Sequence, residues 1–475
     1  MKLLNLVLCV SALSFWQADV VSAAPYIRYE AHSVQGKKAI LSMQKAMTKL
    51  RALGCENRVS WYFQAAIHGV PIPGEQGNLL SNPLCPMYTT ATKKVSSWAK
   101  CASHNESGPP SDIHFLPWHA LYLAHFEKII RKYSGDTKFA IPYWDYEKYP
   151  TLPEAFRVQT RGSLYEPARL KSLNYGSPIA DWAQSTIRQE SLALQGVADY
   201  ESFNSQLNRG LHDFMHDYIG GTASVYNKVY NDTVSAGLMG NVPSAAFDPI
   251  FWLHHANVDR LWRRWIIDNP NQNVTLDQLN SIPWPYRFYN STGGNFPYTM
   301  PKVLAVINAP DYVYDDQMTA KAALGKAEAK RLVEHNIASM PVNVVASHEA
   351  MADVVLNVST EKLRLANKSA HERIVLKLTA AYAGVPNGRY ELYVNLPENV
   401  VATSEAAKKY FVGAVSFFVN DPQGKGGERE FRYDITDELA DSKQDINNFR
   451  LTMVKTTGQK QGSVTIKQAE VLYLN

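Results

Sequence analysis

The spacing of hydrophobic and polar positions divides the chain into two parts. In the first part, hydrophobic residues recur at helical spacing in four stretches, KAILSMQKAMTKLRALG (38–54), PWHALYLAHFEKIIRKY (117–133), SFNSQLNRGLHDFMHDYIGG (202–221) and DPIFWLHHANVDRLWRRWI (248–266). This spacing gives each helix an apolar face. Proline near a start and glycine after an end, as at Pro117 and Gly135, are typical helix boundaries. We therefore predict a mainly α domain at 24–316, built as a four-helix bundle.

In the second part the period changes to two, which is typical of half-buried strands. The candidates are RIVLKLTA, RYELYVNL, YFVGAVSFFV, REFRYDIT, FRLTMVKT and SVTIKQAEVLYL. PNG at 386–388, between the first two, suggests a hairpin turn. Short strands at regular spacing predict an all-β sandwich-like domain at 346–475. The Ala- and Lys-rich segment 317–345 between the two parts predicts an exposed helical linker.

The N-terminus has the features of an export signal. A positive start, MK, precedes the apolar run LLNLVLCVSALSFW, and VSA at 21–23 places small residues before a cleavage point after Ala23. We expect residues 1–23 to be removed and the protein to be secreted or periplasmic. No later apolar run reaches spanning length, so we expect no membrane contact after cleavage.

The net charge argues against nucleic acid as a partner, and the cysteine content indicates how many disulfides to expect. The net charge of +4, from 48 basic and 44 acidic residues among 475, is too small a surplus to indicate nucleic acid. Cleavage of the signal leaves Cys55, Cys85 and Cys101. This odd number in an oxidising compartment predicts one disulfide and one cysteine with another fate. The sequence says nothing about oligomeric state.

Histidines are concentrated in the helical part, where nine of the 13 lie between His68 and His255. His212 and His216 are four residues apart in HDFMH, so they share one face of a helix and can chelate a metal. Asp213 stands where a zinc protease would carry glutamate in HExxH, and its shorter side chain disfavours a zinc hydrolase.

His254 and His255 are adjacent, so on a helix they point ~100° apart and cannot face the same target. We expect His255 to be a ligand and His254 to be packed and hydrogen-bonded. Asp259, one turn on, could accept the second N–H of His255 or pair with Arg260 or Arg263.

His68 and His119 supply further imidazoles from other helices, and His104 and His114 lie between them. His125 points to another face and is expected to be structural. Imidazole suits copper, zinc, iron and nickel, and a single zinc site needs only three or four ligands. Six imidazoles without matching Cys or Glu ligands therefore suggest two metals, and two coppers can each give one electron to O2.

In these histidines and in the motifs around them, the chain resembles the type 3 copper proteins, which are tyrosinases, catechol oxidases and hemocyanins. The motifs, in family order, are AIHG, C-x-x-H, FLPWH followed by FE, IPYWD, LPEAFR, LHDFMHDYIGG and DPIFWLHHANVDRLW. YVY at 312–314 resembles the motif that closes the catalytic domain. The resemblance implies a cofactor of two copper ions, with His212, His216 and His255 on the second copper and His68 and His119 on the first.

The third ligand of the first copper departs from the family pattern. The family places a histidine nine residues before the one in FLPWH, and Pro110 occupies that place here. We favour His104 over His114, because His104 follows Cys101 as a ligand follows cysteine in many relatives. A thioether from cysteine to a histidine on the first copper is frequent in the family. A Cys85–Cys101 disulfide is the alternative.

The resemblance implies oxidation of o-diphenols to o-quinones with reduction of O2 to water, and phenols and O2 as partners. It leaves monophenol hydroxylation open, since Asp213 follows the first ligand of the second copper and could act as a base or misplace the substrate. Val242 stands thirteen residues before His255, where plant catechol oxidases have a gating Phe. The alternatives are a hemocyanin-like O2 carrier, disfavoured by the single domain and small Val242, and an o-aminophenol oxidase. In similar proteins the C-terminal domain covers the copper site until proteolysis.

Overall fold

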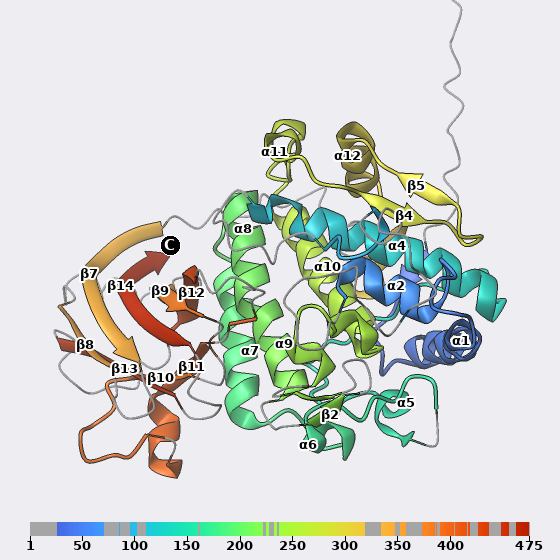
Figure 1. Ribbon diagram of the computed structural model, residues 1–475. Coiled ribbons are helices and arrows are strands. Elements are labelled where there is room, and N and C mark those ends of the chain that lie inside the picture. The colour runs from blue at the N-terminus through green and yellow to red at the C-terminus, as the bar shows by residue number, and fades with distance from the viewer. Residues whose placement is uncertain are drawn as a thin grey trace, which may run out of the picture.

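The computed structural model has a helical domain and a β domain packed side by side (Figure 1). It describes residues 26–70, 85, 96–101, 111–159, 162–221, 225–227, 232–234, 237–318, 334–346, 352–357, 373–384, 386, 390–402, 404–415, 417–418, 426–436, 448–455 and 462–474. The predicted export signal lies outside these residues, so export stays a prediction. Within the described residues, no helix has the length and apolar character needed to cross a membrane.

All four predicted helices are present. They are α1 (Val34–Arg51), α4 (Phe115–Ser134), α10 (Ile250–Asp268) and a helix that changes its winding, formed by α8 (Tyr200–Leu207), the π-helical η4 (Asn208–His212) and α9 (Asp213–Gly220). Two further helices, α2 (Trp61–His68) and α7 (Asp181–Leu194), complete the helices that surround the site. The π-helical turn was not predicted. Such turns occur often at functional sites.

Shorter elements cover the outside of the helical domain. They are α5 (Glu154–Arg157), α6 (Lys171–Asn174), α11 (Leu276–Ser281), α12 (Met300–Asn308), β1 (Tyr26–Arg28), β2 (Val225–Asn227), β3 (Asp232–Val234), β4 (Arg287–Tyr289), β5 (Asn295–Pro297) and β6 (Tyr312–Tyr314). The first and last strands, β1 and β6, pair in parallel. This pairing joins the two ends of the domain.

Local sequence explains where the main helices begin and end. The Ser33 side chain accepts a hydrogen bond from Gly36 N and so caps α1. Gly135 is left-handed, with φ of 80°, and its N–H bonds Arg131 O to end α4. At the start of α10, Asp248 accepts a bond from Ile250 N at 3.0 Å.

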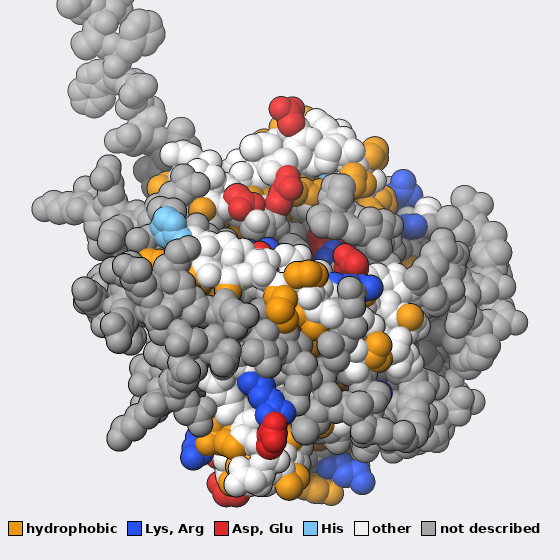
Figure 2. Space-filling model, turned by 90° about the vertical axis from the view of Figure 1, so that its left-hand side faces the viewer, with side chains coloured by type: hydrophobic (Ala, Val, Ile, Leu, Met, Phe, Trp, Pro, Cys, Tyr) orange, Lys and Arg blue, Asp and Glu red, His pale blue; other side chains and the backbone are white. Residues whose placement is uncertain are grey.

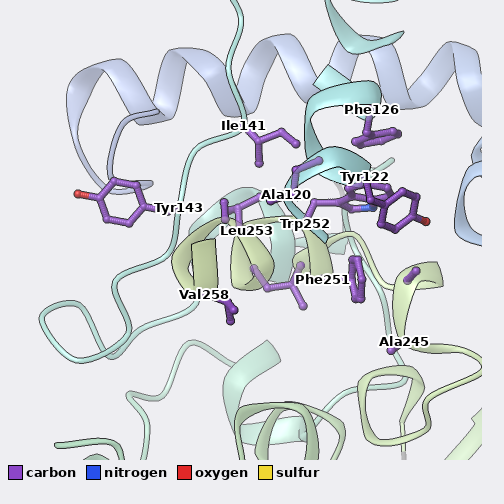
Figure 3. Close-up of a cluster of buried hydrophobic side chains, with 14 of the residues drawn as sticks. Ala120, Tyr122, Phe126, Ile141, Tyr143, Ala245, Phe251, Trp252, Leu253 and Val258 are labelled. Carbon is purple, nitrogen blue, oxygen red and sulfur yellow. The ribbon is translucent and has the colours of Figure 1, made fainter. Parts of the chain in front are cut away.

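An aromatic core packs α4 against α10 (Figure 3). The Trp252 ring stacks on Phe126, with centroids 3.7 Å apart, and lies 4.7 Å from the ring of Tyr122. All three side chains are at most 1% exposed. Burial of three such rings stabilises the pair of helices by several kcal/mol, at roughly 1.5–3 kcal/mol each.

A buried arginine connects four elements of the helical domain. Arg28, on β1, is fully buried; its Nε lies 2.9 Å from Glu127 Oε1 on α4, and its Nη1 lies 2.9 Å from Asp259 Oδ2 on α10. The guanidinium also stacks 3.6 Å from the ring of Tyr312 and bonds the hydroxyl of Tyr314, both on β6. The expected YVY motif therefore acts as a partner of this buried charge.

The β domain is a sandwich of two four-stranded sheets, with orders β11-β10-β13-β8 and β12-β9-β14-β7. The six predicted strands are confirmed as β9 (Arg373–Ala383), β10 (Tyr390–Val394), β11 (Phe411–Val415), β12 (Gly427–Asp434), β13 (Asn448–Lys455) and β14 (Ser463–Leu474). A short 3-10 helix, η8 (Glu405–Tyr410), precedes β11.

Two predictions about this domain are wrong. The strands on either side of PNG do not form a hairpin, because β9 and β10 belong to different sheets. Residues 334–346 form strand β7, which pairs with β14, although we expected a helical linker up to residue 345. Strand β8 (Ala352–Asn357) was also missed. The Ala- and Lys-rich stretch ends before residue 334, and β7 itself contains no Lys and several β-branched residues, which favour a strand. Residues 319–333 of the expected linker lie outside the described part of the chain.

The sandwich lies against the side of the helical domain that is formed by α7 and η4. Strands β11 and β12 pack on α7, and β12 also meets η4 (Figure 1). The outer face of the β domain in Figure 2 shows acidic, basic and hydrophobic side chains interspersed among the described residues. The sandwich is therefore in position to contact the residues that follow η4.

The buried charge of Arg28 makes a first prediction. Replacing it by Met leaves Glu127 and Asp259 without their shared cation, and removing one partner of a buried ion pair costs ~3–5 kcal/mol. We expect Arg28→Met to lower the free energy of unfolding by about that amount in urea denaturation. The control is Arg264→Met, which breaks an exposed pair with Asp268 and should cost below ~1 kcal/mol. Equal effects of the two substitutions would contradict the role given to Arg28.

Candidate metal centre

Five of the six predicted ligand histidines converge in the centre of the helical domain. They are His68 at the end of α2, His119 in α4, His212 at the end of η4, His216 in α9 and His255 in α10. Each is at most 2% exposed. Ring centroids lie 4.3 Å apart for His119 and His255, 4.5 Å for His212 and His216, and 5.7 Å for His68 and His119. The sixth, His104, lies outside the described residues.

Backbone carbonyls hold three of these rings in one orientation. The bonds are His119 Nδ1 to Phe115 O at 2.8 Å, His212 Nδ1 to Asn208 O at 2.9 Å and His216 Nδ1 to Met239 O at 2.9 Å. Because a carbonyl only accepts, each Nδ1 carries the proton and each Nε2 is left as the ligand atom. The Nε2 of His216 faces the Nε2 of His255 at 3.4 Å. The ligand atoms therefore point toward one another.

One loop orients histidines on both sides of the site. Met239 O holds His216, and the backbone of Val242 forms a hydrogen bond with the ring of His68. The loop approaches α9 closely, since a Cβ on Gly220 would lie 2.4 Å from Gly240 N. Val242 is only 5% exposed. Its expected role as a gate for substrates stays a prediction.

Burial keeps His68, His119 and His255 neutral. It lowers the pKa of His68 to about 3, with the neighbouring His212 adding to the effect. Burial also lowers the pKa of His119 and of His255 well below the ordinary range for histidine. Neutral imidazole is the form that binds a metal. A cluster of neutral imidazoles in an apolar surrounding fits copper better than ions that prefer oxygen ligands.

His254 differs in part from expectation. It is fully buried as predicted, and it stacks on His212 at 5.4 Å, but its two ring nitrogens have no hydrogen-bond partner among the described residues. The ligand atoms of His212, His216, His254 and His255 all lie within 4.8 Å of one another. Packing alone therefore leaves His254 within reach of the second metal position.

His114 and His125 are used by the structure elsewhere. The ring nitrogens of His114 meet Tyr286 Oη at 3.0 Å and Ile282 O at 2.6 Å. Those of His125 meet Tyr289 O and Tyr298 Oη. These contacts remove support from His114 as a ligand of the first copper and agree with the structural role expected of His125.

Asp259 does not orient His255. Its Oδ2 accepts from Arg28, Tyr312 and Tyr314, and its Oδ1 lies 3.4 Å from Arg263 Nε. The Nδ1 of His255 has no hydrogen-bond partner among the described residues. Of the two roles considered for Asp259, pairing with arginine is the one found. Arg260 instead pairs with Asp145 and Asp316.

The cysteines form one disulfide, between Cys55 and Cys85. The alternative Cys85–Cys101 disulfide is therefore wrong, and the prediction of one disulfide and one other cysteine is confirmed. Cys101 Sγ lies 3.5 Å from His119 Nε2, and the two form a group with His68 whose ligand atoms lie within 4.8 Å of one another. Cys101 is thus beside the two histidines that are predicted to bind the first copper.

Two residues of the β domain reach the site and were not predicted. The ring of Phe418, just after β11, stacks on His216 with centroids 4.1 Å apart and planes within 9°. Arg429, on β12, forms an ion pair with Asp213, which is 1% exposed. Strand alternation could have suggested Phe418, because in the adjacent pair Phe417–Phe418 the two rings face opposite ways. Nothing in the sequence connects Arg429 with Asp213.

Comparison with known proteins agrees with this geometry. The family description "Common central domain of tyrosinase" matches residues 58–184 and 152–268. A tyrosinase of Hahella sp. (strain CCB-MM4) is 23% identical over 87% of this chain and 92% of its own length. The latent form of the chloroplastic polyphenol oxidase of Prunus armeniaca is 24% identical over 72% of this chain, which covers 61% of that relative.

Solved structures share the fold of both domains. A latent aurone synthase, described as a polyphenol oxidase, superposes with a TM-score of 0.61 at 18% identity, over 95% of this chain and 90% of the other. Latent apple tyrosinase gives a TM-score of 0.60 at 21% identity, over 95% and 98%. These structures show the shared fold. The match of residues 58–268 to the central domain of tyrosinase and the converging histidines lead to one conclusion: the chain is a type 3 copper protein of the tyrosinase and polyphenol oxidase family, an oxidoreductase with a dinuclear copper centre.

Proposed function

We propose that this protein oxidises o-diphenols to o-quinones and reduces O2 to water. The observation that carries the proposal is the convergence of five buried histidines, three of which present Nε2 to the centre because their Nδ1 is fixed by a backbone carbonyl. We assign His68 and His119 to the first copper, with His104 as its third ligand, and His212, His216 and His255 to the second.

When bound, the two coppers supply the electron transfer from the diphenol to O2. The chain's own residues hold the ligands and exclude water. Phe251 contacts the rings of His68 and His255 at 4.9 and 4.1 Å, and Phe115 contacts His119 and His212 at 4.8 and 4.7 Å. These rings form dry walls that favour an aromatic substrate. Asp213 stands beside the second copper, where it could receive the proton of a phenol.

Three other functions predict different results. A hemocyanin-like carrier would bind O2 without oxidising a catechol, and an o-aminophenol oxidase would prefer an amino group in place of one hydroxyl. A zinc hydrolase built on HDFMH would leave His68, His119 and His255 without a role. The metal that is bound and the product that is formed distinguish each alternative from the proposed diphenol oxidase.

The second prediction tests the reaction. Purified protein should contain about two copper ions per chain by metal analysis, as a two-metal site requires. It should consume O2 with a catechol and form the quinone. Activity should disappear when a chelator removes copper, and it should return with copper but not with zinc. Copper binding without quinone formation would instead support an O2 carrier, and comparison with tyrosine and o-aminophenol would define the reaction further.

The third prediction tests the ligand assignment. We expect His255→Gln to reduce copper from about two ions to about one, because a three-histidine site loses a ligand. His254→Gln is the matched control, since it changes the adjacent buried histidine, and it should retain about two. Both proteins are measured by metal analysis and by the electron paramagnetic resonance of isolated Cu(II), so activity is not needed. Loss of copper from His254→Gln alone would reverse the assignment.

We also propose that the β domain keeps the enzyme latent by placing Phe418 in the substrate position. Phe418 is 1% exposed, stacks face to face on His216 and meets His212 edge-on at 5.9 Å. An aromatic ring held there occupies the place that a phenol ring needs to reach the second copper. Phe418 is therefore the residue through which the β domain would cover the copper site.

The fourth prediction follows. Phe418→Ala should raise kcat/KM for a small catechol about two- to tenfold without proteolysis, since a stacked ring pair contributes ~0.5–1.5 kcal/mol. The control is Tyr410→Ala, an aromatic residue of the same domain packed near Tyr393 and Phe411. Unchanged activity in Phe418→Ala, with copper content intact, would argue against the plug. Cutting the chain at 317–333, before β7, should raise activity in the same direction.

A further inference from the structure

The β domain places two chemical groups on one face of α9. Phe418 stacks on His216, and the guanidinium of Arg429 pairs with the carboxylate of Asp213. These helix positions are three residues apart, so Asp213 and His216 are neighbours on the helix surface, with Cβ atoms about 5–6 Å apart. Arg429 Nη2 also donates to Phe418 O at 3.4 Å. Ring and cation are therefore presented together, as parts of one unit.

Asp213 has a different partner on each oxygen. Its Oδ1 lies 3.1 Å from Nδ1 of the ligand His212, whereas its Oδ2 takes the ion pair with Arg429. The first contact belongs to the metal site. The second leaves a charge that only the β domain neutralises, since Arg429 is the one cation paired with Asp213 among the described ion pairs.

The surroundings of Asp213 are acidic. The negative charge of Asp213 raises the pKa of Glu190 and Asp217, after the larger effect of burial. The nearby Arg209 is engaged by Asp112, with an N–O distance of 2.6 Å. When Arg429 leaves, the site therefore keeps a carboxylate beside an apolar ring position and lacks a cation for it. Such a buried, unpaired charge is costly, and a cation carried by the substrate would compensate it.

We propose that the preferred substrates are phenols that carry a positively charged group, an ammonium or guanidinium, on a short side chain. The ring takes the place of Phe418 over His216, and the cation takes the place of Arg429 beside Asp213. This inference rests on the proposed function and adds the chemical class of its substrate. The β domain would then block the site by imitating both parts of that substrate.

Binding to the copper-free, full-length chain tests the proposal without catalysis. The background is Phe418→Ala with Arg429→Ala, which vacates both positions. By calorimetry, phenethylamine should bind at least about tenfold tighter than phenylacetate, as expected for a hydrogen bond to a charged partner. Adding Asp213→Asn should remove this preference, whereas adding Asp181→Asn, on the exposed start of α7, should keep it. Equal binding of the two ligands in the background would overturn the proposal.

Two further measurements distinguish failure of the proposed substrate class from failure of the proposed function. Phe418→Ala alone leaves Arg429 on Asp213, so it should bind the cationic ligand no better than the anionic one; this variant changes no residue of the metal site. In the copper-loaded background, dopamine should exceed 3,4-dihydroxyphenylacetate in kcat/KM by about tenfold. Oxidation of 4-methylcatechol without a charge preference would refute the substrate class and keep the proposed function. No oxidation of any of the three would refute the proposed function itself.

Discussion

The helical domain depends on the ion pairs that the buried guanidinium of Arg28 forms with two carboxylates. A fully buried cation is stable only when carboxylates and hydrogen-bond acceptors surround it. Its carboxylates, Glu127 and Asp259, come from α4 and α10, the helices that carry His119 and His255. Each carboxylate lies one or two helical turns from a ligand. The spacing of two ligand helices is thus set by charge compensation near the metal position, with the N-terminal strand supplying the charge.

Around the converging histidines, backbone carbonyls, which carry no net charge, fix most of the ring orientations. Phe115, Asn208 and Met239 each offer a carbonyl to a histidine Nδ1, and Val242 bonds the ring of His68 through its backbone. Carbonyls fix the tautomer of each ring without adding negative charge beside it. Asp213 is the exception beside His212. Its charge is balanced from outside the helical domain, by Arg429, and this links the metal site to the β domain.

Much of the fold and most of the candidate ligands could be predicted from the sequence, because both are marked by patterns within short segments of the chain. The helices, six strands and five converging histidines are visible as periods and motifs. Pairing between distant residues is not. The strand β7 forms because it meets β14, and the Arg429–Asp213 pair joins residues 216 positions apart. For the same reason the sequence suggested an arginine partner for Asp259 but not Arg28, which lies 231 residues away.

The position of Phe418 shows how the two domains became mutually dependent. Its neighbour Phe417 is buried in the sandwich, with its ring 5.3 Å from that of Tyr382 and 5.5 Å from that of Phe431. Phe417 packs into the sandwich core whereas Phe418 stacks on His216, so the packing that fixes Phe417 also helps to place Phe418. The sandwich core and the cover of the copper site are therefore specified by the same two residues. A sandwich that packs correctly places an aromatic ring on the histidines as a direct consequence of its own folding.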